Sequence, residues 1–297
     1  MTLDILVPYW GDPTLMRMTV ESVLAQTSPD WRLVVVDDAY PDHAVTDWLR
    51  SLDDPRIRAE RNETNLGITA NYRRCRELAT SELVMFLGCD DLLLPDYVEV
   101  VTTAVAGRPE ADVVQPGVRV VGADGAMRGT LTDAVKRVVR RSAVRGAGTA
   151  ELSGERLAVS LLHGDWLYWP SLTFRRTTLA SVDFREGFPI IQDFALVIDL
   201  VCAGATLLVL PTECFVYRRH EESASATTLS DGSRLAAERR YYALAAEQMR
   251  ALGWRQAERA ARARLTSRAH ALTLLPQAVV GRRRDAVGQL GRHALGR

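Results

Sequence analysis

The chain has 297 residues, of which 47% are hydrophobic and 25% are charged, so it can bury a substantial core as one large domain or two small ones. Its 37 basic residues balance 37 acidic residues, and a formal net charge of +0 argues against a general nucleic-acid binder, which needs a strongly basic surface. Any electrostatic function must therefore come from local charge.

The four cysteines are scattered, without a Cys-x-x-Cys pair, which predicts reduced thiols in a cytoplasmic protein. The N-terminus enters a strand directly, without a signal-peptide pattern. No apolar run approaches the ~18 residues of a membrane span. These features predict a cytoplasmic protein that is soluble or at most peripherally attached to the cytoplasmic face of a membrane.

Strand and helix patterns alternate through the first ~120 residues, which predicts parallel strands joined by crossover helices. Strands are predicted at residues 3–8, 31–36, 57–60, 83–87 and 113–121. Helices are predicted at 13–27, 44–52 and 68–79, the first of them with Asp12 as N-cap and Pro13 at its first position.

The later sequence is less regular. Residues 128–150 lose the apolar period and are rich in arginine and glycine, which predicts a flexible loop. Helices are predicted again at 152–162 and 194–203. Past residue 230 the sequence predicts helices alone, one ended by Gly253 and a second near 256–275 ended by Pro276.

The most informative stretch is the apolar run at 84–89, which ends in two adjacent carboxylates, Asp90 and Asp91. A second apolar run ends in Asp37-Asp38, and a third opens the chain at residues 3–8. Open α/β sheets bind ligands at the carboxyl ends of their strands. The pattern therefore predicts a crevice in which carboxylates hold a divalent cation against a phosphate.

Read together, several segments resemble the large inverting glycosyltransferase family of the A-type fold, usually called family 2. They are Val7-Pro8-Tyr9-Trp10, Val36-Asp37-Asp38, Asn65-Leu66-Gly67, Asp90-Asp91 before Leu94-Pro95-Asp96, Gln192-Asp193-Phe194 and Tyr217-Arg218-Arg219-His220. The resemblance implies an α/β fold with a Rossmann-like, mostly parallel central sheet flanked by helices. It implies a catalytic domain at 1–225, with a nucleotide-binding half at about 1–122 and an acceptor half at about 123–225, and a helical C-terminal extension at 226–297.

The resemblance also implies a Mg²⁺ or Mn²⁺ ion and a nucleotide-sugar donor, with UDP or dTDP favoured. Asp91 is the expected metal ligand, Asp90 is expected to contact the ribose, and Asp38 is expected to accept the imide N–H of the base. The remaining implied contacts are Pro8, Tyr9 and Asn65 to the nucleotide, His220 to the metal, and Arg218 and Arg219 to the phosphates. Gly88 stands where many relatives carry a further Asp, which leaves the number of protein ligands open.

Inversion requires a base that removes the proton of the acceptor hydroxyl, and the resemblance assigns this role to Asp193. Gln192 precedes it where the family usually has Glu. Asp193 can also serve as a helix N-cap, and the two roles are compatible. Trp166 and Trp169 are expected either to line the acceptor site or to belong to the core.

Two rival functions remain open. One is a non-catalytic homologue that binds a nucleotide sugar. The other is a sugar-nucleotide pyrophosphorylase, a class that needs a Gly-rich phosphate loop directly after the first strand, where Pro8-Tyr9-Trp10-Gly11 stands instead. A dinucleotide oxidoreductase also needs glycines at this place, and this sequence lacks them. The acceptor is left open between a glycan, a lipid-linked intermediate and a small molecule. The C-terminal helices are candidates for a homo-oligomer contact.

Overall fold

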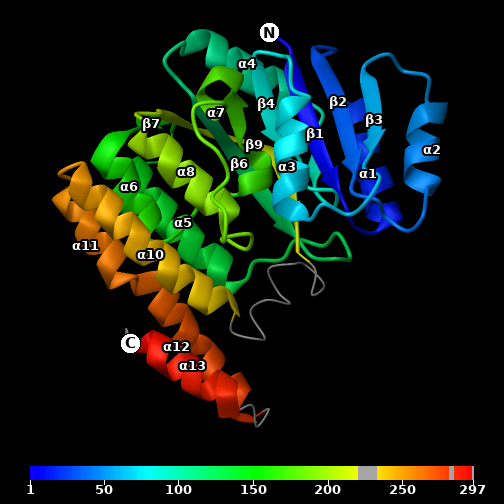
Figure 1. The fold of residues 1–297 in the computed structure, drawn as a ribbon. Coiled ribbons are helices and arrows are strands. Elements are labelled where there is room, and N and C mark those ends of the chain that lie inside the picture. Colours follow the sequence, from blue (N-terminus) through cyan, green and yellow to red (C-terminus); the bar gives the residue numbers. More distant parts are fainter. Residues whose placement is uncertain (147, 220–232, 281–283, 296–297) are drawn as a thin grey trace.

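The computed structural model describes residues 1–297 except 147, 220–232, 281–283 and 296–297. The strands are β1 (Leu3–Tyr9), β2 (Trp31–Asp37), β3 (Ile57–Arg61), β4 (Leu83–Phe86), β5 (Leu92–Leu93), β6 (Val113–Val121), β7 (Ala150–Leu152), β8 (Thr173–Arg175) and β9 (Leu207–Arg218). Within the described residues they form one nine-stranded sheet in the order β3-β2-β1-β4-β8-β6-β9-β5, and β7 pairs with β9 (Figure 1).

The sheet is parallel where the sequence alternates between strands and helices. β1 pairs in parallel with β2 and with β4, and β2 pairs in parallel with β3. β8 runs antiparallel to both β4 and β6, and β6 pairs in parallel with β9. The predicted α/β fold with a mostly parallel central sheet is therefore confirmed.

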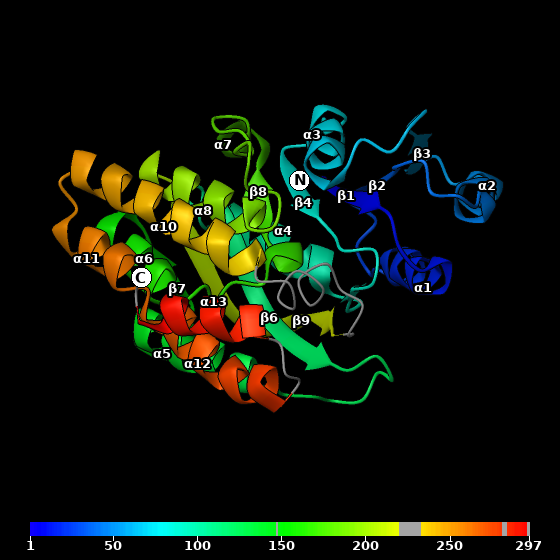
Figure 2. The same cartoon turned by 60° about the horizontal axis from the view of Figure 1, so that its bottom comes forward.

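Helices cover both faces of this sheet (Figures 1 and 2). They are α1 (Pro13–Leu24), α2 (Ala44–Ser51), α3 (Ile68–Glu77), α4 (Tyr97–Gly107), α5 (Leu131–Val144), α6 (Gly154–His163), α7 (Arg176–Leu179), α8 (Gln192–Cys202), α10 (Ser233–Ala251), α11 (Arg255–Ala263), α12 (Leu265–Val280) and α13 (Arg284–Ala294), with a short 3₁₀ turn η1 at Trp169–Ser171.

Two hydrophobic cores result, because successive side chains of a strand point to opposite faces. Ile5 and Val7 of β1 pack with residues of α1, α2 and α4. Leu6 faces the other way and joins the core formed with α3, α6 and α8. Strands buried on both faces read as continuous apolar runs, and this explains why the sequence predicts them well.

The start of α1 follows the sequence prediction. Asp12 is the N-cap, and its Oδ1 accepts the backbone N–H groups of Thr14 at 2.6 Å and Leu15 at 3.2 Å. The helix ends at Leu24, three residues before the predicted end.

The flexible loop predicted at 128–150 is wrong, because most of it is the helix α5, followed by β7. Thr130 and Asp133 begin the helix with a capping box, in which each side chain accepts the backbone N–H of the other residue. The weak apolar period has a physical reason, since α5 contacts the rest of the protein partly through the polar side chains of Asp133, Lys136 and Arg140.

The C-terminal region is helical, as predicted. α10 ends at Ala251, and Gly253 follows in a left-handed conformation with φ of 74°. The predicted single second helix is wrong: left-handed backbone at Arg264 separates α11 from α12, and α12 continues past Pro276.

Helices α10 and α11 belong to the same core as the preceding half of the chain. Tyr241, Met249 and Ala257 are buried among residues of α6 and α8. No helix in the described part of the chain combines the length and apolar composition that crossing a bilayer requires.

Candidate active site

The carboxyl ends of β1 and β2 bring predicted nucleotide-binding residues together. The two strands are in register, so that Tyr9 lies opposite Asp37, and the backbone N–H of Asp38 donates to the carbonyl of Tyr9 at 3.0 Å. β4 pairs with the other edge of β1 and leads into Asp90 and Asp91. The crevice predicted at the ends of these strands therefore has its expected arrangement.

The two carboxylates of Asp90 and Asp91 converge over Gly88. A Cβ atom at Gly88 would lie 2.6 Å from Oδ2 of Asp91 and 3.0 Å from Oδ1 of Asp90. Side-chain atoms do not approach a carboxylate oxygen so closely, so a larger residue at this position would displace these oxygens. Glycine leaves room for the two carboxylates as they stand.

Asp91 is held rigidly at the bottom of the site. Only 1% of the residue is exposed, and its Oδ1 accepts the backbone N–H of Arg218 at 2.9 Å. Its own carbonyl accepts the hydroxyl of Thr19 at 2.8 Å. Oδ2 is the oxygen that lies over Gly88.

The charge of Asp91 is poorly stabilised by the protein alone. Burial raises the pKa of this carboxyl well above its ordinary value, and the neighbouring charge of Asp90 raises it further, against a lowering by Arg218. A hard divalent cation prefers carboxylate oxygens and would offset this penalty.

The donor set fits a magnesium-like ion shared with a substrate. Among the described residues, no three His, Cys, Asp or Glu side chains cluster as a metal site. Mg²⁺ commonly binds through one or two carboxylates together with substrate phosphates. The Asp90–Asp91 pair can provide the carboxylates. The predicted ligand His220 lies outside the described residues.

Asp38 anchors the loop that contains Asn65. Its Oδ1 accepts the side-chain amide of Asn62 at 2.7 Å and the backbone N–H of Leu66 at 2.8 Å. Its Oδ2 accepts the backbone N–H of Gly67 at 3.0 Å. Since Oδ2 takes one of these three bonds, it has the capacity for another donor. Recognition of a base by Asp38 stays a prediction.

Aromatic side chains border this end of the site. The buried hydroxyl of Tyr9 has no hydrogen-bond partner in the part of the chain that the structure describes. The Tyr9 ring lies 5.3 Å from the ring of Tyr40, which meets the half-exposed Trp10 edge-on at 5.4 Å. A buried hydroxyl without a partner is unfavourable, and a bound ligand could supply the missing bond. The neighbouring Pro8 is partly exposed.

Asp193 stands at the start of α8 with its side chain partly exposed. It lies in the first turn of the helix, whose residues from Phe194 to Val201 are all buried. Its Oδ1 accepts the backbone N–H of Phe194 at 2.8 Å. The N-cap position is Ile191, so capping does not account for Asp193, although the helix N-terminus does favour its negative charge.

Tyr217 of β9 packs against Tyr168, with 5.2 Å between the ring centres. Burial raises the pKa of its hydroxyl, and the charges of Asp91, Asp90 and Asp193 raise it further, against a lowering by Arg219. The sequence analysis gave Tyr217 no role, although its place beside Arg218 was a signal.

Lys136, the only lysine of the chain, is a second residue that the sequence analysis passed over. Its Nζ donates to the carbonyl of Leu167 and lies 4.6 Å from the centre of the Tyr168 ring. Burial lowers its pKa, while the charges of Asp165 and Asp193 raise it. The structure thus places this cation against the segment that contains Leu167 and Tyr168.

The two predicted phosphate contacts brace the site in this structure. Arg218 donates from Nε to the carbonyl of Asp90 at 3.0 Å and from Nη1 to the carbonyl of Ala123 at 3.3 Å. Arg219 forms two bonds to the carboxylate of Asp133, at 3.1 and 2.7 Å. Contact of either arginine with phosphate stays a prediction.

The structure does not support Trp166 and Trp169 as acceptor-binding residues, because both indoles are core. Trp166 is 1% exposed. Trp169 is 9% exposed, stacks on Phe86 at 5.5 Å and donates its Nε1–H to the hydroxyl of Tyr72 at 3.3 Å. Neither ring therefore offers a face to a sugar.

The Asp133–Arg219 pair predicts a pH-dependent stability. Burial alone would raise the pKa of Asp133, but its bonds from Arg219 and Thr130 lower the pKa to about 2. A folded-state pKa below the ordinary value stabilises the protein above pH ~4, and this contribution is lost as the pH falls toward 2. We expect Asp133→Asn to lower the free energy of unfolding by about 2 kcal/mol at neutral pH.

Urea unfolding followed by circular dichroism at several pH values measures this effect. The difference between wild type and Asp133→Asn should shrink as the pH falls below about 4. A difference that stays constant with pH would show that the charge of Asp133 is not responsible.

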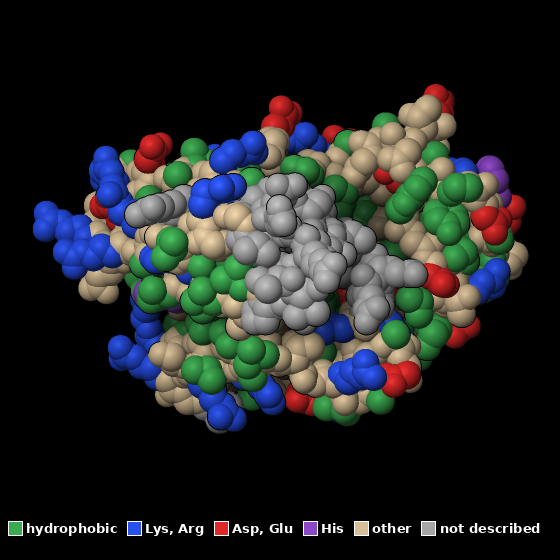
Figure 3. Space-filling view, turned by 90° about the horizontal axis from the view of Figure 1, so that it is seen from below, with side chains coloured by type: hydrophobic (Ala, Val, Ile, Leu, Met, Phe, Trp, Pro, Cys, Tyr) green, Lys and Arg blue, Asp and Glu red, His purple; other side chains and the backbone are tan. Residues whose placement is uncertain are grey.

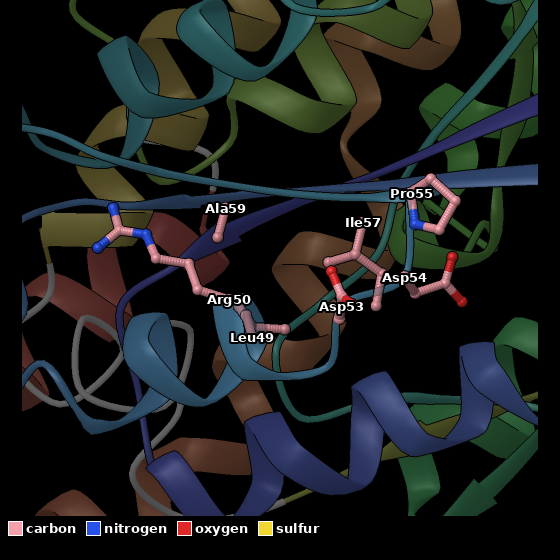
Figure 4. A pocket seen from close by; sticks show the side chains of 7 residues that line it. All are labelled: Leu49, Arg50, Asp53, Asp54, Pro55, Ile57 and Ala59. Atoms are coloured by element: carbon pink, nitrogen blue, oxygen red, sulfur yellow. The ribbon is translucent and has the colours of Figure 1, made fainter.

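A separate pocket lies away from these residues. Leu49 and Arg50 at the end of α2, the turn at 53–55, and Ile57 and Ala59 of β3 line it (Figure 4). Ile57 is the first residue of β3, whereas the predicted site lies at the carboxyl ends of the parallel strands. This pocket therefore does not belong to the site.

The fold and the paired carboxylates together define a protein of the A-type glycosyltransferase class. The family model described as "Glycosyl transferase family 2" matches residues 4–153, just over half of the chain. The chain therefore belongs to glycosyl transferase family 2.

Relatives in sequence match shorter stretches. The putative colanic acid biosynthesis glycosyl transferase WcaA of Escherichia coli K12 is 28% identical over 99 residues, which are 33% of this chain and 36% of that protein. The glucosyl-dolichyl phosphate glucuronosyltransferase of Haloferax volcanii is 33% identical over 98 residues, 32% of this chain and 31% of that protein. The chain thus spans about a third of the length of these curated relatives.

Among solved structures, residues 1–349 of S. aureus TarS share the fold. That structure has a TM-score of 0.66 at 16% sequence identity, and the match covers 99% of this chain and 81% of that one. The same TarS segment in complex with UDP-GlcNAc has a TM-score of 0.62 at 15% identity, with 82% of this chain and 66% of that one covered.

Proposed function

We propose that the protein is a metal-dependent inverting glycosyltransferase that moves a sugar from a nucleoside diphosphate to a hydroxyl-bearing acceptor. The observation that carries this proposal is the convergence of the Asp90 and Asp91 carboxylates over Gly88, directly after β4. Membership of family 2 supports the reaction class.

Asp91, with Asp90 beside it, is the proposed protein contribution to a Mg²⁺ or Mn²⁺ site. A bound ion of this kind neutralises the charge that develops on the departing diphosphate. Asp38 and Tyr9 lie at the strand ends where the base and ribose are proposed to bind.

Asp193 is proposed to take the proton of the acceptor hydroxyl. As this oxygen forms its bond to the anomeric carbon, the bond from that carbon to the diphosphate oxygen breaks on the opposite side. The electron pair leaves with the nucleoside diphosphate, and the proton resides on the Asp193 carboxylate. Attack opposite the leaving group inverts the configuration at the anomeric carbon.

UDP and dTDP are the proposed nucleotides, because a carboxylate such as Asp38 matches the imide N–H of uracil or thymine. The TarS neighbour is described in complex with UDP-GlcNAc, and this agrees with a UDP-sugar donor. The acceptor class stays open, since the relatives carry different names.

The variant Gly88→Ala tests the carboxylate pair directly. Its methyl group would meet Asp91 Oδ2 at 2.6 Å and displace it. We expect calorimetry with UDP and Mn²⁺ to show binding at least roughly tenfold weaker than wild type, a loss of about 1.4 kcal/mol. Gly107→Ala is the matched control, since a Cβ there meets nothing within 4 Å.

Chelation of the metal should weaken UDP binding by wild type to the level of Gly88→Ala. Equal affinity with Mn²⁺ and with chelator would contradict the metal assignment. Metal-dependent binding of UDP-sugars without turnover of any donor would instead favour the non-catalytic homologue.

A further inference from the structure

Helix α5 turns some of its apolar residues toward the core, but others lie on the outside. Leu131 and Val138 are each 67% exposed and Val135 is 40% exposed, and Met127 just before the helix is 71% exposed. The three helical residues are spaced at i, i+4 and i+7, so they form one continuous stripe. A surface helix ordinarily turns such a stripe toward the core.

Polar contacts hold α5 in this orientation. On its inner side Asp133 pairs with Arg219, and Lys136 donates to the carbonyl of Leu167. One turn later, Arg140 Nη2 donates to the carbonyl of Leu210 at 3.0 Å. The outward stripe is therefore fixed by the fold.

A row of arginines runs along one side of this stripe. Arg137, Arg141 and Arg145 are exposed and spaced four residues apart, which aligns them on the helix surface. Residues 127–145 contain six cationic side chains and a single carboxylate, Asp133. The positive charge is local, because the whole chain is balanced.

We propose that this outer face of α5, formed by Leu131, Val135 and Val138 with the arginine row, docks on an anionic lipid bilayer. A helix with an apolar stripe and flanking arginines lies in the plane of the membrane interface, with the stripe among the acyl chains and the cations among the headgroups. Each Lys or Arg near an anionic surface strengthens binding roughly fivefold.

The chemistry of the face favours a membrane over a second copy of the chain. A symmetric contact between antiparallel α5 helices would place the arginine rows of both copies against each other, and like charges in contact are unfavourable. On the surface seen from below, apolar and cationic side chains are intermixed on the side of the molecule that holds α5 together with the C-terminal helices α10 to α13 (Figures 2 and 3).

Docking through this face would bring the membrane close to the candidate active site. Asp133, in the first turn of α5, is bonded to Arg219, the residue after β9. Tyr168 also donates its hydroxyl to Asp133, at 2.9 Å. The proposal itself does not depend on which reaction the site performs.

Flotation with lipid vesicles tests the proposal with the full chain. Vesicles of phosphatidylcholine mixed in equal parts with phosphatidylglycerol should carry the protein upward, and vesicles of phosphatidylcholine alone should carry much less. Arg137→Gln/Arg141→Gln/Arg145→Gln should weaken binding to the anionic vesicles on the order of 100-fold. Binding to both kinds of vesicle alike, or to neither, overturns the proposal.

The apolar stripe needs its own variant, because arginines alone attract any polyanion. Leu131→Ser/Val138→Ser should weaken binding at least tenfold, since two exposed side chains lose their insertion into the acyl region. Leu252→Ser is the control, an equally simple change at a residue 45% exposed on another surface. Unchanged binding of the stripe variant overturns docking through α5.

Light scattering tests whether a second copy of the chain occupies this face instead. Without lipid, wild type and Leu131→Ser/Val138→Ser should have the same oligomeric state. A dimer that dissociates in this variant would show that a second copy covers the stripe, and the membrane proposal would fail.

Discussion

Replacing Asp193 by Asn should lower turnover of a UDP-sugar by a factor of about 10² to 10⁴, which is the usual contribution of a general base. The amide cannot accept the proton of the attacking hydroxyl at neutral pH. Asn keeps an oxygen that can accept the Phe194 N–H at the start of α8, so the fold should persist. UDP release from the donor measures the turnover.

The expected loss is confined to catalysis. UDP affinity of Asp193→Asn in the presence of Mn²⁺ should stay within about twofold of wild type, because the base serves the acceptor side. Asp47→Asn is the matched control, since Asp47 also lies in the first turn of a helix, α2, and is largely exposed. Near-wild-type turnover by Asp193→Asn would mean that another group takes the proton.

Replacing Asp91 by Asn should abolish the stabilisation that Mn²⁺ and UDP together give to wild type. At concentrations 100 times the dissociation constant, ligand binding stabilises the folded state by about 2.7 kcal/mol. Thermal unfolding with and without ligands reads out this shift. Asp96→Asn is a matched control, because Asp96 is the N-cap of α4 without a side-chain capping bond.

Without metal, the same Asp91→Asn variant should be more stable than wild type at neutral pH. Burial raises the folded-state pKa of Asp91 above its unfolded value, so the folded protein loses stability as the pH rises from about 4 through the raised pKa. The gain amounts to roughly 1.4 kcal/mol for each unit of the shift, and it should vanish in acid. A variant that still responds to Mn²⁺ and UDP as wild type does would remove Asp91 from the metal site.

The N-terminal half of the sheet was predictable because its strands are apolar and its motifs are local. The runs before Asp38 and Asp91 are buried on both faces, and adjacent parallel strands necessarily end side by side. The role of Gly88 was not readable, since only the folded loop shows both carboxylates turning over it.

Helix α5 escaped prediction because much of its inner side is polar. Asp133, Lys136 and Arg140 satisfy their polar groups on segments distant in sequence, which no local pattern reveals. The two tryptophans were ambiguous for a related reason, since clustered aromatics suit both a core and a sugar site. Burial decides the question for Trp166 and Trp169.

The anomeric configuration of the sugar first released from an α-linked UDP-sugar tests the account most directly. In the presence of Mn²⁺, water can take the place of the acceptor, so no acceptor needs to be known. Proton NMR before mutarotation should show the β anomer, formed in wild type and Gly107→Ala and suppressed in Asp193→Asn and Gly88→Ala. Release of the α anomer, or release that is equal with chelator and with Mn²⁺, would contradict a metal-dependent inverting transfer.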